Sequence, residues 1–169
     1  ASWDECFSEC ESLGTLSLPK SITKIGQRSF IGCGGLRELN FQNLSNLKEI
    51  GAYAFEDCID LVSVNLPESL ELMYDGAFRE CTQLQEVYLP NQLKEIMEDT
   101  FYGCTSLDPD SESFHWPDQL QEIGHRVFGK TTFEEIHIPE GVRELGGWVF
   151  EDNINLKKVH IPKTTIAGG

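Results

Sequence analysis

The chain has 169 residues, of which 40% are hydrophobic and 24% charged, and its 13 basic and 28 acidic residues give a net charge of −15. A field of this sign repels nucleic-acid phosphates and anionic lipid headgroups, so we expect neither as a direct partner. Apolar runs are only a few residues long, which excludes a membrane-spanning helix and direct insertion into a membrane.

A phenylalanine that returns every 22 to 27 residues organises the sequence. The unit is clearest in residues 50–67, where a small residue precedes the phenylalanine, a cysteine follows it by three positions, and leucine and valine residues lead to a proline. The recurring phenylalanines are Phe7, Phe30, Phe55, Phe78, Phe101, Phe128 and Phe150. A repeat of this length is the signature of a solenoid, in which each unit packs only against its neighbours.

Each unit contains a short segment of alternating residues that ends at proline, as in residues 64–66, 87–89, 136–138 and 159–161. Alternation of apolar and polar residues, with many β-branched side chains, predicts a short strand with one buried face. Equivalent strands of successive units run in the same direction, so we predict a parallel sheet. The proline ends each strand because it has no N–H group to donate to the sheet.

The rest of each unit turns the chain back toward the next strand. Apolar residues three apart, such as Leu47 and Ile50, cross the core, and a glycine often follows them, as at Gly51. The spacing of three around the phenylalanine and the cysteine then predicts a single helical or 3-10 turn on the convex side. Acidic residues fill the variable positions, and we expect them to face water. They include Glu56, Asp57, Asp60, Glu80, Glu98 and Asp99.

Five of the six cysteines share the position three residues after the phenylalanine. They are Cys10, Cys33, Cys58, Cys81 and Cys104. Later units carry Thr131 and Asn153 at this position, so the position requires a small side chain rather than a thiol. No Cys-x-x-Cys pair occurs, and we therefore predict free, buried thiols rather than disulfides or metal ligands. Cys6 replaces a small residue and is expected to be buried too.

Three irregularities interrupt the period: two extra residues at 43–46, four at 107–113, and one missing at 129–132. Insertions in solenoids bulge into loops, often beside the binding face. The acidic spacing of residues 108–112 is similar to half of a calcium-binding loop. The glycine turn and terminal glutamate of such a loop are missing, so we expect a solvated loop.

Three of the four histidines fall in one outward-facing column of the predicted sheet. The column is Ser17, Asn40, Asn65, Tyr88, His115, His137 and His160. The column beside it is Thr15, Glu38, Ser63, Glu86, Ser113, Glu135 and Lys158. The histidines are compatible with a pH-sensitive recognition surface, with a metal site that includes Glu135, or with ordinary surface residues. Because an open ladder lacks the groups that orient a metal ligand, we assign no metal site.

The candidate ligand-binding residues therefore lie on the concave face. They are Tyr88, His115, His137, His160, Glu86 and Glu135. Tyrosine is a frequent hot-spot residue, and curved solenoids often bind through their concave surface. The sequence has no phosphate loop, nucleophile elbow or zinc-protease motif, so we predict no catalytic residues and no cofactor.

From Cys6 to about Pro162 the repeated unit resembles the BspA-like class of leucine-rich repeats. The resemblance implies a β-rich α/β solenoid: a leucine-rich repeat superhelix with a parallel concave β-sheet and short helical or 3-10 turns on the convex side. We expect one domain over residues 1–169, made of about seven units and forming a segment of a longer array.

The same resemblance implies a non-catalytic protein–protein recognition or adhesion module that is secreted or displayed at a cell surface. The excess of acidic residues is first of all typical of a solvated surface, and a protein partner with a basic surface is the sharper alternative. The alternative is an acidic structural or scaffold subunit of a larger multiprotein assembly, held through its edges or its convex side.

Overall fold

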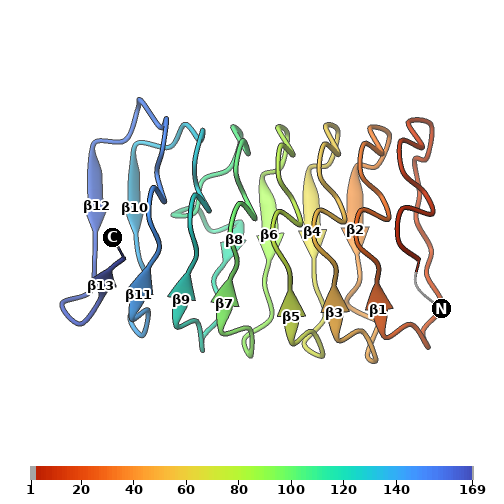
Figure 1. Cartoon of the computed structure of the whole chain (residues 1–169), viewed down its shortest axis with the longest axis horizontal. Helices are drawn as coiled ribbons and strands as arrows, with labels where there is room; N and C mark the ends of the chain where they lie inside the picture. Colours follow the sequence, from red (N-terminus) through yellow and green to blue (C-terminus); the bar gives the residue numbers. More distant parts are fainter. Residues whose placement is uncertain (1–2, 169) are drawn as a thin grey trace.

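The computed structural model describes residues 3–168 as a row of stacked coils, with the chain ends at opposite ends of the row (Figure 1). Most coils contribute two short strands. The even-numbered strands form one face, which we call the even-strand face: β2 (Glu38–Asn40), β4 (Ser63–Asn65), β6 (Glu86–Tyr88), β8 (Phe114–His115), β10 (Glu135–His137) and β12 (Lys158–His160). The odd-numbered strands form the odd-strand face: β1 (Lys24–Ile25), β3 (Glu49–Ile50), β5 (Leu72–Met73), β7 (Glu95–Ile96), β9 (Glu122–Ile123), β11 (Glu144–Leu145) and β13 (Ile166–Ala167).

The predicted parallel sheet is confirmed, and its strands pair with equivalent repeat positions in register. Leu39 pairs with Val64, and Val64 pairs with Val87. This register is fixed because a slip of one residue would turn the buried side chains toward solvent. The odd-numbered strands were not predicted. In β1, β3, β7 and β9 the signal is a charged residue followed by a buried isoleucine, as in Lys24–Ile25 and Glu49–Ile50.

A column of phenylalanine rings fills the centre of the solenoid. Neighbouring rings lie 5.1 to 6.3 Å apart between centroids and within 10° of parallel along the whole series from Phe7 to Phe150. Phe30, Phe55 and Phe78 have no exposed surface, whereas Phe7 in the first coil is 39% exposed. The predicted stacking of equivalent side chains is therefore confirmed.

The predicted helical or 3-10 turns are wrong: within residues 3–168 these segments are turns without helix. The cause is a left-handed residue on each side of the phenylalanine, such as Tyr53 (φ 55°) and Asp57 (φ 57°) around Phe55. One left-handed residue ends a right-handed helical run. The N–H group of Phe55 donates instead to the carbonyl of Ala77 in the next coil, at 2.9 Å. The turn region is therefore bonded between coils, as the strands are.

Residues 3–168 include no helix that could span a membrane.

All six cysteines are free, but only four of them are buried. Each buried thiol contacts the phenylalanine carbonyl of the preceding coil, as Cys81 Sγ does with Phe55 O at 3.2 Å. Burial raises the pKa of Cys58 to about 12, which keeps this thiol protonated. The predicted burial is wrong for Cys6 and Cys10, which are exposed because the first coil is covered by another coil on one side only.

Each face is divided into two sheets. The even-strand face divides between β8 and β10, and the odd-strand face divides between β5 and β7. The first break follows the insertion at 107–113. Its Asp110 carboxylate accepts the backbone N–H of His137 at 2.8 Å, so a side chain serves as the acceptor for this strand residue.

Candidate functional site

The even-strand face arranges four of the predicted site residues as two stacked pairs of rings. The rings of Tyr88 and His115 lie 4.3 Å apart and 7° from parallel. Those of His137 and His160 lie 3.9 Å apart and 1° from parallel. Pairing of β6 with β8 and of β10 with β12 brings these side chains together, because paired residues of parallel strands project on the same side. His115 and His137 belong to separate sheets, so the outward column is interrupted between them.

Polar neighbours hold the first ring pair in place. Tyr88 donates its hydroxyl to Glu68 Oε1 at 2.5 Å, and His115 Nε2 lies 2.8 Å from Asn91 Oδ1. The hydrogen bond to Glu68, together with burial, raises the pKa of Tyr88, so the hydroxyl remains a donor. A shallow hollow of about 260 Å³ is lined by Glu86, Tyr88 and His115, which brings three of the predicted residues to one place.

The second ring pair contacts two carboxylates. His137 Nδ1 lies 2.8 Å from Asp110 Oδ2, and His160 Nε2 lies 2.7 Å from Glu135 Oε1. Glu135, His137 and His160 each offer one ligand atom, and these atoms lie within 4.8 Å of one another. Glu135 is thus brought to the histidines as the alternating strand pattern predicts.

The sequence pattern missed three residues that orient these rings. Glu68 and Asn91 stand just after the strand-ending prolines, and Asp110 lies in the insertion. No repeated spacing marks them. The only available signal was that polar residues follow Pro67 and Pro90, in turns that border the strands.

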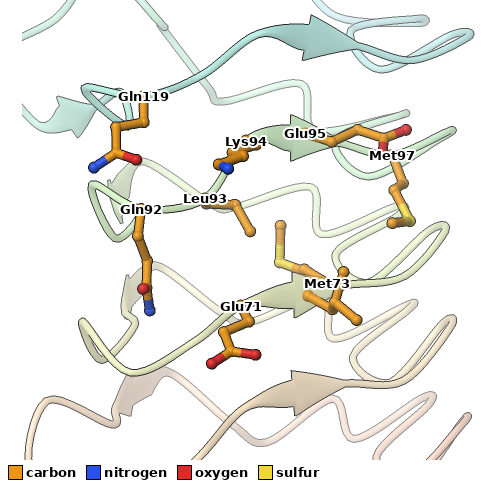
Figure 2. Close-up of a pocket in the computed structure, with 9 residues that line it drawn as sticks. Glu71, Met73, Gln92, Leu93, Lys94, Glu95, Met97 and Gln119 are labelled. Carbon is orange, nitrogen blue, oxygen red and sulfur yellow. The ribbon is translucent and has the colours of Figure 1, made fainter.

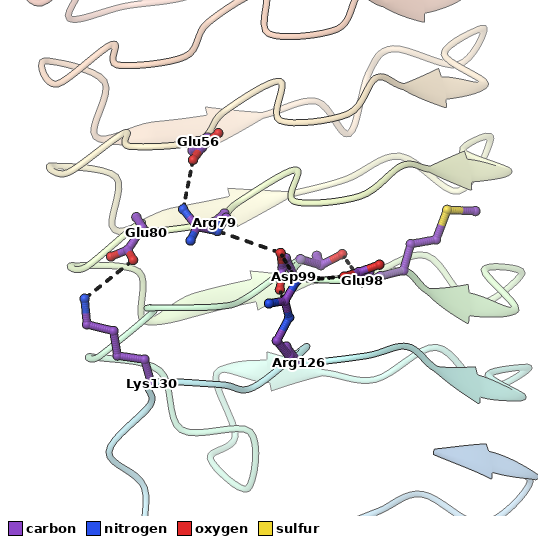
Figure 3. Close-up of polar contacts among 9 residues, drawn as sticks. Glu56, Arg79, Glu80, Glu98, Asp99, Arg126 and Lys130 are labelled. Atoms are coloured by element: carbon purple, nitrogen blue, oxygen red, sulfur yellow. Dashed lines mark hydrogen bonds and ion pairs between the residues drawn. The ribbon is translucent and has the colours of Figure 1, made fainter. Parts of the chain in front are cut away.

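The turns around the repeated phenylalanines, such as residues 53–57, form a side of the solenoid that we call the turn side. It carries a row of ion pairs between coils (Figure 3). Arg79 bridges Glu56 at 3.0 Å and Asp99 at 3.9 Å, and Arg126 contacts Asp99 at 3.2 Å. Asp99 is buried, which corrects the expectation that it faces water. Burial raises the pKa of Asp99, and the arginine Arg126 opposes this shift. Much of the acid in this row is therefore already paired within the molecule.

A groove of about 450 Å³ opens on the odd-strand face between β5 and β7 (Figure 2). Its lining includes Leu72, Met73, Leu93 and Met97, with charged residues among them. The signal for it was present in the sequence, because Met97 occupies the position after the isoleucine that is glycine in four other units.

The repeat matches a family model described as the BspA type leucine-rich repeat region, with six copies over residues 3–109 and 108–167. Among the curated proteins, none matches the chain.

Several solved structures are similar. A leucine-rich repeat protein from Bacteroides ovatus is 25% identical, with a TM-score of 0.64 over 98% of this chain and 54% of that one. A leucine-rich cell surface protein from Faecalibacterium prausnitzii is 27% identical, with a TM-score of 0.75 over 92% of this chain and 41% of that one. A leucine-rich repeat protein from T. pallidum is 29% identical, with a TM-score of 0.67 over 98% of this chain and 64% of that one.

The chain therefore spans less than two thirds of each of these relatives. The family model covers nearly all of the chain, and the solved relatives share its solenoid fold. The chain belongs to the BspA-type leucine-rich repeat family.

Proposed function

We propose that the chain is a non-catalytic protein-recognition module, secreted or displayed at a cell surface, that binds a protein partner through its even-strand face. Membership of the leucine-rich repeat family supports a binding role, since such solenoids generally offer a surface rather than a catalytic pocket. A similar solved structure is described as a cell surface protein, which supports the location.

The observation that carries the proposal is the stacked pair of Tyr88 and His115. Glu68 and Asn91 hold both rings before any partner arrives. Binding then requires little loss of side-chain freedom, which is the main advantage of a preorganised surface. Tyrosine is also a frequent interface hot spot.

Charge indicates the kind of partner. The chain has a net charge of −15, and Glu68 and Glu86 lie at the ring pair. A partner with lysine and arginine residues at its contact surface would be attracted at long range and aligned at short range. We therefore propose a basic protein surface as the ligand.

Affinity capture with the purified chain, followed by quantification of each captured protein, tests this proposal. Tyr88→Ala should weaken capture of the partner by about 30-fold or more, because hot-spot truncations cost about 2 kcal/mol or more. Tyr74→Ala is the matched control, since Tyr74 is an exposed tyrosine next to β5 on the odd-strand face. Loss of capture with Tyr74→Ala and retention with Tyr88→Ala would move the binding surface to the other face.

One observation favours the scaffold alternative. The last coil exposes Val159, Ile161 and Ile166, at 37%, 50% and 69% of their surfaces. Val159 belongs to β12 and Ile166 to β13, so apolar side chains are exposed at both strands of this coil, and exposed apolar side chains can mark a contact surface. A scaffold that assembles through this end would be larger than a monomer in light scattering and would return to a monomer with Ile161→Lys. The recognition module should be a monomer with or without that change.

A further inference from the structure

We propose that Glu135, His137 and His160 form a binding site for one zinc-class divalent metal ion, with Asp110 as a positioning residue. This site is separate from the Tyr88–His115 pair and does not rest on the proposed protein recognition.

The sheet register places the three ligands together. His137 pairs with His160 between β10 and β12, and Glu135 lies two residues before His137, on the same side of its strand. Their ligand atoms lie within 4.8 Å of one another. Ligand atoms of a tetrahedral zinc site lie about 3.4 Å apart, given bonds of about 2.1 Å.

Small side-chain movements are therefore enough to close the site. The side chains of His137, His160 and Glu135 are 60%, 49% and 43% exposed, so they have space in which to turn toward an ion. The two imidazole rings now lie parallel, and metal binding would tilt them until one nitrogen of each points to a common centre. The ion would take the place of the hydrogen between His160 Nε2 and Glu135 Oε1, which lie 2.7 Å apart, and that proton would pass to water.

Asp110 supplies the orienting group that an open column of histidines otherwise lacks. Its Oδ2 lies 2.8 Å from His137 Nδ1, and its Oδ1 accepts the N–H of the same residue at 2.8 Å. A carboxylate on one ring nitrogen fixes the tautomer of a metal-binding histidine and raises the basicity of the other nitrogen. His137 Nε2 is thus the nitrogen left for a metal. The sequence predicts no metal site because it predicts no group that orients the histidines. Asp110, in the insertion, is such a group.

The donor set indicates the class of metal. Two imidazole nitrogens and one carboxylate oxygen suit zinc and its neighbours such as copper or nickel, whereas magnesium and calcium prefer oxygen ligands throughout. A fourth position would be filled by water. The other ring pair differs: it has one imidazole, and Asn91 already lies 2.8 Å from His115 Nε2.

Calorimetric titration of the whole chain with zinc chloride tests the site. The protein should carry Cys6→Ser and Cys10→Ser, because these exposed thiols are competing zinc ligands. We expect one ion per chain, with the NMR signals of His137 and His160 shifting and that of His115 unchanged. His137→Ala and His160→Ala should each weaken binding by about 10-fold or more, and Asp110→Asn by about 10- to 100-fold.

The matched control is His115→Ala, which removes a histidine from the same face and should leave zinc affinity unchanged. Thermal unfolding of each variant without metal separates a lost ligand from a lost fold, and Asp110→Asn should change affinity with little change in unfolding. Absence of binding at about 1 mM zinc would overturn the proposal, as would an equal loss of affinity in His115→Ala. Either result would leave the Tyr88 capture experiment unaffected.

Discussion

The same repeat builds a column of rings inside the solenoid and a column of rings on its surface, yet only the interior column is continuous. The step from Phe101 to Phe128 is the longest in the chain, and these rings still stack at 5.9 Å and 10° from parallel. At the same place on the surface, β8 and β10 do not pair. Burial between two neighbouring coils holds the interior rings in register, whereas an insertion can displace the surface strands without loss of the core. The contact between Asp110 and His137 is therefore possible on the surface, where β8 and β10 do not pair.

The largest expected effect is the loss of an interior ring. Phe78→Ala should lower the free energy of unfolding by about 3–5 kcal/mol, because the ring is fully buried between Phe55 and Phe101 and its loss leaves a cavity. Chemical denaturation measures this change.

Phe7→Ala is the comparison within the same column. Phe7 is 39% exposed and, within residues 3–168, stacks on Phe30 alone, so the loss should be less than about half of that at Phe78. Equal losses at the two positions would show that the first coil is covered by more than the second coil.

A smaller effect is expected at the buried thiols. Cys81→Ala should lower the free energy of unfolding by about 1–2 kcal/mol, because it removes a buried sulfur atom and its contact with Phe55 O. Cys10→Ala, at the same repeat position but exposed, should stay within about 0.5 kcal/mol of the original protein. Thiol labelling gives an independent measurement, since Cys6 and Cys10 should react in the folded protein and Cys81 only after unfolding.

The sequence predicts the interior well because burial imposes the same side chain at the same position in every coil. The phenylalanine column, the parallel strands and the four buried thiols all follow from positions that recur. The turns were predicted wrongly as helical. Spacing of three suits both a helical turn and a turn bonded to the next coil, and only the backbone angles of residues such as Tyr53 and Asp57 distinguish them.

The candidate site is predictable only in part. Alternation along the strands places Tyr88, His115, His137 and His160 on one face, and the structure keeps them there. The division into two pairs depends on where the insertion folds, and no repeat constrains that loop. The partners Glu68, Asn91 and Asp110 therefore emerge only from coordinates. Whether the six predicted residues bind a partner stays a prediction.

The smallest expected effect concerns the pH dependence of stability at Asp99, on the turn side between core and surface. Within residues 3–168 no group donates a hydrogen bond to Asp99 Oδ1, although Arg126 Nε lies 3.2 Å away. Burial raises the pKa of this carboxyl, so the folded protein binds its proton more tightly than the unfolded chain does. Its contribution to the free energy of unfolding should therefore rise as pH falls through the raised pKa toward the ordinary value of about 3.9.

Asp99→Asn removes this titration while keeping a residue that tolerates the observed φ of 60°. The free energy of unfolding of the original protein minus that of the variant, measured by denaturation from neutral pH to about pH 4, should rise as the pH falls. The free energy of unfolding of the variant should be highest relative to that of the original protein at neutral pH, where Asp99 is charged and incompletely paired. If the two curves of unfolding free energy against pH run parallel, Arg79 and Arg126 compensate fully for the effect of burial on Asp99. The turn side would then behave as an ordinary solvated surface rather than as an extension of the core.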